Sequence, residues 1–457
     1  MKLSKNKTVS LNLMSTIVLQ GLTFFTTPIF SKLLGPANYG ITSVYQTWVM
    51  LLSAIFSLQA GGVVGLALNE FPKSEKHNYR FNVMILIICS FLFFSILFLF
   101  FTFFLRTDII FFLLAVIHSF GLYCVQYYNS INIFEFRADL NFYTAMWVSV
   151  LTTFLSLVLI NLYSYNTNYM GRIYGQAIPY FIIGTVISAK LLRKDECYIK
   201  FDYWKYTIPI TLPIVFHVIS NLILGQSDRI MLKEMCDNAA VGIYTLAATF
   251  SAVVQSLWNA FNTSWVAFYY EYSSKEEIER IRLSTFNYLE FFSVIVCGFI
   301  LLSPEVFIIF APKEFQIGIR FIPIFTLGYL FVFLYSFPVN YEFFNKQTRI
   351  IAIITMLTAL INVALNYLLI RCYHIYGAVL ATTIAHGIQF ALHYCAAKKI
   401  KKSYFPYKIY YFIPPIIIVI FCIILFYLNI NWVIRWVIAL AIGLFEIRRI
   451  YIRKSIY

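Results

Sequence analysis

The chain has 457 residues, of which 61% are hydrophobic and only 12% are charged, and its formal net charge is +15. Soluble globular domains carry about 25% charged residues, and disordered chains are poor in apolar residues and rich in charge, so this composition excludes both classes. The mean hydropathy of +0.77 instead indicates a polytopic membrane protein.

Apolar runs of the roughly 20 residues that a membrane-spanning helix needs recur along the whole chain. We therefore expect an all-α polytopic membrane protein with about 14 transmembrane helices. In chain order, the expected helices are 10–32, 41–68, 82–105, 109–134, 142–163, 172–192, 207–230, 241–268, 285–303, 321–343, 350–370, 375–396, 409–428 and 432–450. The longest loops between them, 69–81, 193–206 and 304–320, are too short for a soluble catalytic domain.

The distribution of lysine and arginine predicts the orientation of these helices. With the N-terminus in the cytoplasm, 26 of the 35 basic residues fall on the cytoplasmic side and 9 on the outer side. Because Lys and Arg gather in cytoplasmic loops, we predict a protein of the cytoplasmic (inner) membrane with both termini in the cytoplasm. The same bias accounts for the net charge, so nucleic acid is not an expected partner.

Two short motifs recur at one spacing. Residues 172–175 (RIYG) return as 374–377 (HIYG), and residues 37–41 (ANYGI) return as 239–243 (AAVGI), both at an offset of 202. This offset covers six spans, an even number, so both halves enter the membrane in the same direction, as parallel repeats do. We predict a six-helix lobe over 1–195, a second over 207–400, and two additional helices with a cytoplasmic tail over 405–457, with the substrate path between the lobes.

The sequence contains no pattern that is typical of an enzyme active site. Paired catalytic carboxylates, a Ser/His/Asp order and a phosphate-binding glycine loop are missing, and the eight cysteines form no Cys-x-x-Cys pair and no metal-ligand spacing. We therefore expect a transporter without catalytic residues, metal or cofactor.

Polar residues at membrane depth are costly in lipid and are candidates for function. Arg172, Arg320 and Arg371 begin or end spans on the outer side, where they either anchor helices or bind substrate. Asp228 and Arg229 lie near the outer end of span 207–230 and either tether the rim or line a cavity. The full set of candidate substrate-binding residues is Lys32, His118, Arg172, His217, Asp228, Arg229, Arg320, Asn362, Asn366 and Arg371.

Several of these candidates have a second, structural interpretation. His118 and His217 lie near mid-membrane, and Asn362 and Asn366 share one face of span 350–370. Each of the four either packs through hydrogen bonds between helices or contacts the substrate. Arg435 lies outside the repeat, and we expect it to extend to the membrane surface.

Other residues are candidates for ion coupling and for movement. Asp228 and Glu290 are possible sites for coupling transport to protons or sodium. Pro28, Pro209 and Pro213 interrupt the opening helix of each half, where proline removes a backbone donor, and act either as hinges or as static kinks. The candidates are more often cationic or neutral than acidic, which favours an anionic, phosphate-bearing passenger.

Several segments resemble one transporter family. Residues 30–40 (FSKLLGPANYG) resemble the "LGP..YG" turn after the first helix of bacterial polysaccharide repeat-unit flippases of the Wzx type, which belong to the multidrug/oligosaccharidyl-lipid/polysaccharide (MOP) exporter superfamily. The prolines of span 207–230, residues 227–232 (SDRIML) and residues 239–244 (AAVGIY) look like the family's seventh-helix pattern. Residues 365–370 (LNYLLI), followed by 376–378 (YGA), are similar to its "LN..LI…YG..GA" stretch.

This resemblance implies a twelve- or fourteen-helix transporter of two six-helix lobes around a central, often cationic cavity. It further implies that the chain flips polyprenyl-diphosphate-linked oligosaccharide to the outer leaflet by alternating access, for capsule, O-antigen or a similar surface polymer. The expected partners are this lipid-linked substrate, the membrane lipids, and polysaccharide polymerase or chain-length proteins.

Three alternatives stay open. A peptidoglycan-precursor flippase is a related possibility that differs only in its substrate. A cation-coupled drug or metabolite exporter of the same superfamily needs a buried acid, which span 10–32 lacks, although Asp228, Glu290 or Glu342 supplies one later in the chain. A membrane polysaccharide polymerase is also rich in Phe and Tyr, but such enzymes carry a large external loop, and the loops here are short.

Overall fold

The computed structural model describes residues 5–193, 197–400 and 405–453, with side chains from Gly21 onward except that of Thr23. Every regular element within these ranges is helical. Ten of the described helices are long and apolar enough to cross a membrane, and a bent pair, Phe24–Phe56 with Ala60–Glu70, forms an eleventh span. The expectation of an all-α polytopic membrane protein is thus confirmed.

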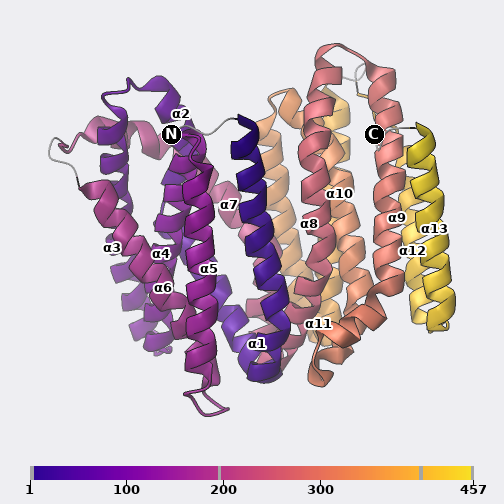
Figure 1. The fold of residues 1–457 in the computed structure, drawn as a ribbon, viewed down its shortest axis with the longest axis horizontal. Coiled ribbons are helices and arrows are strands. Elements are labelled where there is room, and N and C mark those ends of the chain that lie inside the picture. The colour runs from indigo at the N-terminus through magenta and orange to yellow at the C-terminus, as the bar shows by residue number, and fades with distance from the viewer. Residues whose placement is uncertain (1–4, 194–196, 401–404, 454–457) are drawn as a thin grey trace. The chain divides into compact units, whose positions relative to one another are not determined.

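The chain forms two compact units, which divide within α7 (Phe201–Met235) between Gln226 and Ser227. In the first unit (indigo to magenta in Figure 1), α7 is preceded by a series of helices. These are α1 (Lys5–Phe56), η1 (Ala60–Val63), α2 (Val64–Glu70), α3 (Lys76–Phe104), α4 (Ile109–Phe134), α5 (Ala138–Ile160) and α6 (Asn168–Leu192).

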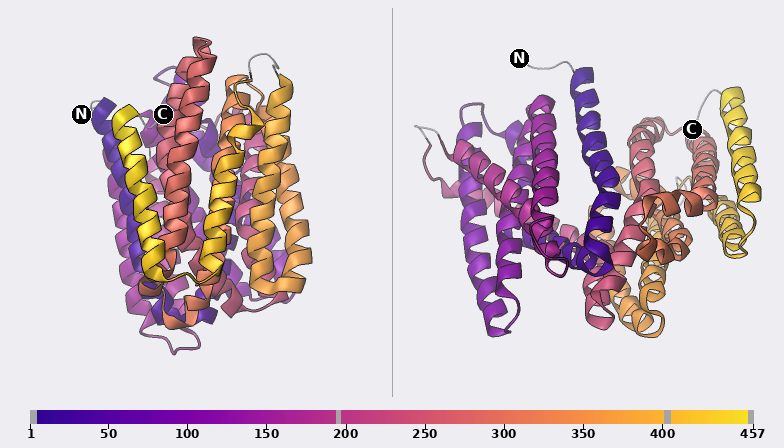
Figure 2. Two further views of the ribbon diagram at one scale, coloured as in Figure 1. Left: turned by 90° about the vertical axis from the view of Figure 1, so that its right-hand side faces the viewer. Right: turned by 60° about the horizontal axis from the view of Figure 1, so that its bottom comes forward.

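The second unit continues from α7 with the remaining helices (Figures 1 and 2). These are α8 (Asn238–Ser274), α9 (Ile278–Phe310), η2 (Lys313–Phe321), α10 (Ile322–Phe344), α11 (Thr348–Ile400), η3 (Ile409–Tyr411), α12 (Ile413–Tyr427) and α13 (Trp432–Arg453). The predicted repeat symmetry and the lobe boundaries 1–195 and 207–400 stay a prediction.

The fourteen expected spans fall on twelve long helices of the described residues, because α1 and α11 each contain two. α1 leaves helical geometry at Gly35 (φ 67°, ψ 172°), within the predicted turn, and α11 does so at His374 (φ 50°, ψ −125°). The expected span 41–68 differs from the structure, since Leu58 and Gln59 adopt positive φ and bend the chain by 54° before α2. The expected span 432–450 corresponds to α13, which is not among the ten apolar helices.

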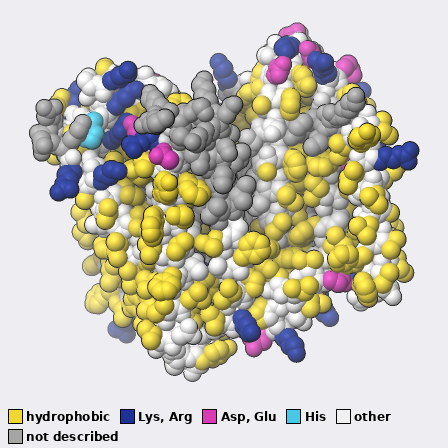
Figure 3. All heavy atoms as spheres, in the orientation of Figure 1, with side chains coloured by type: hydrophobic (Ala, Val, Ile, Leu, Met, Phe, Trp, Pro, Cys, Tyr) yellow, Lys and Arg dark blue, Asp and Glu magenta, His cyan; other side chains and the backbone are white. Residues whose placement is uncertain are grey.

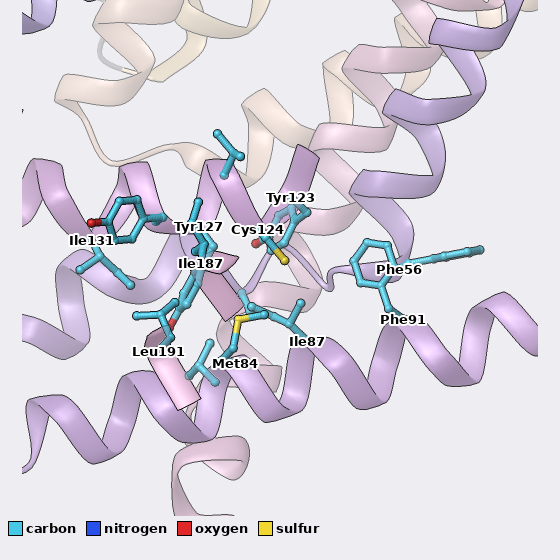
Figure 4. Packing of buried hydrophobic residues seen from close by; sticks show 14 of the residues in the cluster. Phe56, Met84, Ile87, Phe91, Tyr123, Cys124, Tyr127, Ile131, Ile187 and Leu191 are labelled. Carbon is cyan, nitrogen blue, oxygen red and sulfur yellow. The ribbon is translucent and has the colours of Figure 1, made fainter. Parts of the chain in front are cut away.

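Each unit has its own aromatic-rich core. In the first unit, the core joins α1, α3, α4 and α6 through side chains such as Phe56, Met84 and Tyr127 (Figure 4). In the second, fully buried Trp265 and Phe337 pack edge to face at 5.4 Å between ring centroids. Such pairs add about 0.5–1.5 kcal/mol beyond the burial of their area.

The outer surface of each unit is apolar along the helix flanks, whereas the charged side chains visible in Figure 3 gather at the helix ends. Along α3, for example, Phe93, Phe100 and Phe104 are each at least 60% exposed. Aromatic residues exposed in this way along a helix are stable when lipid, and not water, surrounds them.

The break at Gly35 depends on glycine, because its φ and ψ lie in a region that is essentially closed to other residues. We expect Gly35→Ala to cost about 1–3 kcal/mol and to lower the Tm of the purified protein. Gly21→Ala in the same helix is the matched control, since a Cβ built there meets no atom within 4 Å. Equal Tm values for the two variants would contradict this account of the break.

Candidate functional site

A buried carboxylate organises the polar interior of the second unit. Asp228, on α7, is only 1% exposed. Its carboxylate accepts hydrogen bonds from the Tyr244 hydroxyl on α8, the Asn366 amide on α11 and, at 2.7 Å, the Thr382 hydroxyl, also on α11. Three donors from two other helices therefore replace the water that this charge loses on burial.

The hydrogen bonds extend beyond the carboxylate. Asn362 Oδ1 accepts from Asn366 Nδ2 at 3.1 Å and from Ser227 Oγ at 3.3 Å, and Asn362 Nδ2 donates to Thr382 Oγ1 at 3.3 Å. We call these residues the Asp228 cluster: Ser227, Asp228, Tyr244, Asn362, Asn366 and Thr382. Asn366 Oδ1 has no hydrogen-bond partner within the described part of the chain.

The break at His374 is what allows α11 to contribute twice to this cluster. In a continuous helix, Asn366 and Thr382 would lie about 24 Å apart at a rise of 1.5 Å per residue. Both contact the same carboxylate, so the chain must turn back between them. His374 lies midway, eight residues from each.

The cluster unites three of the predicted residues, Asp228, Asn362 and Asn366. A fourth, Arg229, places its guanidinium carbon 5.9 Å from the centroid of the Tyr244 ring. Sequence reasoning missed Tyr244 and Thr382 as functional residues. Thr382 and Asn366 lie equally far from His374 in the sequence. This equal spacing is the one signal that could have pointed to Thr382.

The predicted residues of the first unit lie among aromatic rings. The guanidinium carbon of Arg172 lies 3.6 Å from the centroid of the Phe30 ring. His118 is buried between Tyr45 and Tyr180, with ring centroids at 5.7 and 4.8 Å, and its Nδ1 lies 3.3 Å from the Tyr45 hydroxyl. These contacts hold His118 within the core of the unit.

The remaining candidates are not brought together. Lys32, Arg320 and Arg371 are exposed. His217 is half-buried and pairs with Asn221 of its own helix at 3.1 Å.

The predicted hinges do not coincide with the break in α1. That break lies at Gly35, seven residues after Pro28, and α7 runs through Pro209 and Pro213 as one helix. A glycine, with no Cβ to oppose positive φ, is the residue at which the α1 backbone leaves the helix.

The last helix changes the interpretation of two charged residues. Glu290, a predicted coupling carboxylate, forms ion pairs with Arg449 at 2.7 Å and Arg453 at 3.2 Å, both on α13. Arg435, expected to extend to the membrane surface, is instead 9% exposed and forms an ion pair with Glu305 of α9. The expectation for Arg435 was wrong because α13 turns its charged face toward α9.

A second buried acid lies on α10. Glu342 and His393 are both fully buried, and His393 Nδ1 lies 2.8 Å from Glu342 Oε2. The ring of Tyr335 stacks on His393 with centroids 5.8 Å apart. Glu342 Oε1 and His393 Nε2 have no hydrogen-bond partner among the residues described. The pair therefore retains capacity to bind a proton or another polar group.

The chain matches the family model described as "Polysaccharide biosynthesis protein" over residues 6–268, more than half of its length. It belongs to this family. A Haemophilus influenzae protein described as an uncharacterized membrane protein is 22% identical over 368 residues, which cover 78% of this chain and 88% of that protein.

Solved structures share the fold of this family member. The lipid II flippase MurJ, in an inward closed conformation, matches with a TM-score of 0.76 and 18% identity, over 98% of this chain and all of that one. An inward-facing multidrug resistance MATE family transporter of the MOP superfamily matches with a TM-score of 0.59 and 16% identity, over 87% and 98% of the two chains. The expected relation to polysaccharide biosynthesis proteins is confirmed by the family match, and the fold is one that also occurs in a lipid II flippase and in a transporter of the MOP superfamily.

Removal of the Asp228 carboxylate takes an acceptor from three donors, of which Tyr244 and Asn366 are buried. Each unsatisfied donor costs about 1–3 kcal/mol, so we expect Asp228→Ala to lower the Tm strongly. Asp237→Ala is the control: it removes an exposed acid that caps α8 through Ala240 N at 2.7 Å, at a cost of about 1 kcal/mol. A smaller loss for Asp228→Ala than for Asp237→Ala in the same detergent would refute the tethering role.

The Glu342–His393 contact predicts strong energetic coupling. Removal of one partner leaves the other buried polar group unsatisfied, at a cost of about 1–3 kcal/mol, so each of Glu342→Gln and His393→Gln is destabilising, whereas the double variant loses less than their sum. A thermal double-mutant cycle measures this coupling. The exposed pair Glu271–Lys275, at 2.6 Å, is the control, and its coupling is only about 0.3–0.5 kcal/mol. Additive effects of the two core substitutions would show that the contact contributes nothing.

Proposed function

We propose that this protein flips polyprenyl-diphosphate-linked oligosaccharide repeat units across the cytoplasmic membrane by alternating access, for assembly of a surface polysaccharide. The observation that carries the proposal is the family match over residues 6–268, which ties the chain to polysaccharide biosynthesis. The fold supports a transport role in polysaccharide biosynthesis, because the same helix arrangement occurs in a lipid II flippase.

The charge distribution supports an anionic passenger. Arg172 lies against an aromatic ring, and it has no ion pair among the described residues. A guanidinium held in this way keeps its charge and its donors available for a diphosphate. Together with the predicted cytoplasmic termini, this charge suits a carrier that loads lipid-linked sugar from the cytoplasmic leaflet and hands it to polymerase and chain-length proteins outside.

We further propose that the Asp228 cluster binds the coupling ion, either a proton or sodium. The cluster offers carboxylate, amide carbonyl and hydroxyl oxygens, which are the ligands that hard cations prefer. One of them, Asn366 Oδ1, has no partner within the described ranges. The cluster joins α7, α8 and both arms of α11, so occupation of the site changes the interactions that hold these helices together.

The experiment that tests this function uses a strain that lacks the gene, with the neighbouring genes intact. We expect polyprenyl-linked oligosaccharide to accumulate in the membrane and surface polymer to disappear, and the wild-type gene to restore both. Asp228→Asn keeps the shape of the side chain and removes its charge, so we expect it to be made at normal levels and to fail to restore surface polymer. Asp237→Asn, at the exposed start of α8, is the matched control and restores it.

One outcome would overturn the proposed flipping activity, and another would overturn only the proposed coupling role of the Asp228 cluster. Normal surface polymer with altered sensitivity to cationic compounds would indicate a cation-coupled exporter, which a buried carboxylate also suits. Full restoration by Asp228→Asn, with accumulation confirmed in the deletion strain, would leave flipping in place and remove the coupling role of the cluster.

A further inference from the structure

A pocket of about 700 Å³ opens at one end of the second unit. It lies where η2 and the turn at 428–431 between α12 and α13 meet the ends of the spanning helices; Figure 2 shows this turn. The side chains that matter for its chemistry are Gln316, Arg320, Tyr376, Tyr427, Asn429 and Arg435. None of them belongs to the Asp228 cluster, so the pocket is a separate feature of the molecule.

The pocket contains an incompletely satisfied buried cation. Arg435 is only 9% exposed, and one of its terminal nitrogens donates to Glu305. Trp436 Nε1 donates to the other oxygen of that carboxylate at 3.1 Å. Arg435 Nε, however, has no acceptor among the described residues. A buried charged donor without an acceptor is costly, and the residue that carries it lines the pocket.

A second arginine adds to the positive charge. Arg320 is exposed, and its backbone carbonyl accepts a hydrogen bond from the Tyr427 hydroxyl at 2.6 Å, which fixes this part of η2 against α12. No ion pair of Arg320 occurs among the residues described. The lining has two arginines and no acid, and Glu305 offsets one charge, so the pocket keeps a net positive charge.

The surroundings of the pocket point to a membrane lipid. Guanidinium groups bind phosphate through paired hydrogen bonds, and hydroxyl and amide groups such as those of Tyr376 and Gln316 donate to its remaining oxygens. Beside the pocket, Leu428 and Trp432 are 66% and 59% exposed. Tryptophan and tyrosine gather at the level of lipid headgroups. An anionic headgroup with apolar chains fits both the charged pocket and this apolar rim.

We propose that the η2 pocket binds the phosphate headgroup of a membrane lipid through Arg320 and Arg435. The volume falls within the range of about 300–1,000 Å³ that is typical of ligand sites. A phospholipid and a polyprenyl diphosphate both present this chemistry. The site does not depend on the proposed flipping activity, since any phosphate-bearing lipid that reaches this end of the helices can occupy it.

Lipid binding to the purified full-length protein in detergent tests the proposal by native mass spectrometry. The probes are phosphatidylglycerol, undecaprenyl diphosphate, inorganic phosphate and, as a lipid without phosphate, diacylglycerol. We expect at least one phosphate-bearing lipid to bind. We expect Arg320→Gln to weaken the affinity for that lipid about tenfold, because one charge-assisted hydrogen bond is lost. Arg349→Gln, an exposed arginine at the start of α11 and outside the pocket, is the matched control and leaves binding unchanged.

A second variant keeps the test independent of folding. Arg435→Lys retains a cation near Glu305 but loses the guanidinium fork, so we expect weaker lipid binding with little change in Tm. Stronger binding of phosphatidylglycerol or of undecaprenyl diphosphate identifies which source of phosphate the site takes. Equal binding of diacylglycerol, binding of inorganic phosphate alone, or no effect of Arg320→Gln would each overturn the proposal.

Discussion

A charged or polar group at membrane depth must find its partners within the protein, because lipid offers none. This constraint explains the arrangement of the second unit better than any single apolar contact does. Asp228 gathers donors from α8 and from two places on α11. Arg435 and Glu290 pair α13 with α9. Each of these charges therefore favours particular helices as neighbours, whereas apolar flanks of similar composition permit many pairings.

The same constraint bears on the helix break at His374. The break itself lies between the expected spans 350–370 and 375–396, where His374 is exposed, but it returns the chain to the buried polar groups of the Asp228 cluster. The turn brings Thr382 and Asn366 to one carboxylate and to a common partner, Asn362. The positive φ of His374, a non-glycine residue, costs free energy. The hydrogen bonds of the cluster, which a continuous helix cannot form, offset this cost.

The sequence was sufficient to predict the helical class, the position of most spans and the turn at Gly35. Hydropathy indicates the spans, and the glycine-proline pair indicates the turn, because both depend on local geometry. It was also sufficient to place Asn362 and Asn366 on one face of a helix, which depends only on a spacing of four. It was insufficient for Tyr244, Thr382 and the Glu342–His393 pair. Their roles arise from packing between helices that lie far apart in the chain, and no periodicity encodes which face meets which.

Arg435 shows the limit most clearly. Its position near the start of the expected span 432–450 suits a side chain that extends to the membrane surface, and only the packing of α13 on α9 reveals the acid that faces it. Once paired, it still has one donor without an acceptor, just as Asn366 has one acceptor without a donor. The two groups are complementary in sign: an oxygen inside the helix cluster attracts a cation, and a guanidinium nitrogen at the helix ends attracts an anion. In a protein surrounded by lipid, where unpaired polar groups are costly, a bound ion at the first position or a headgroup at the second would supply the missing partner.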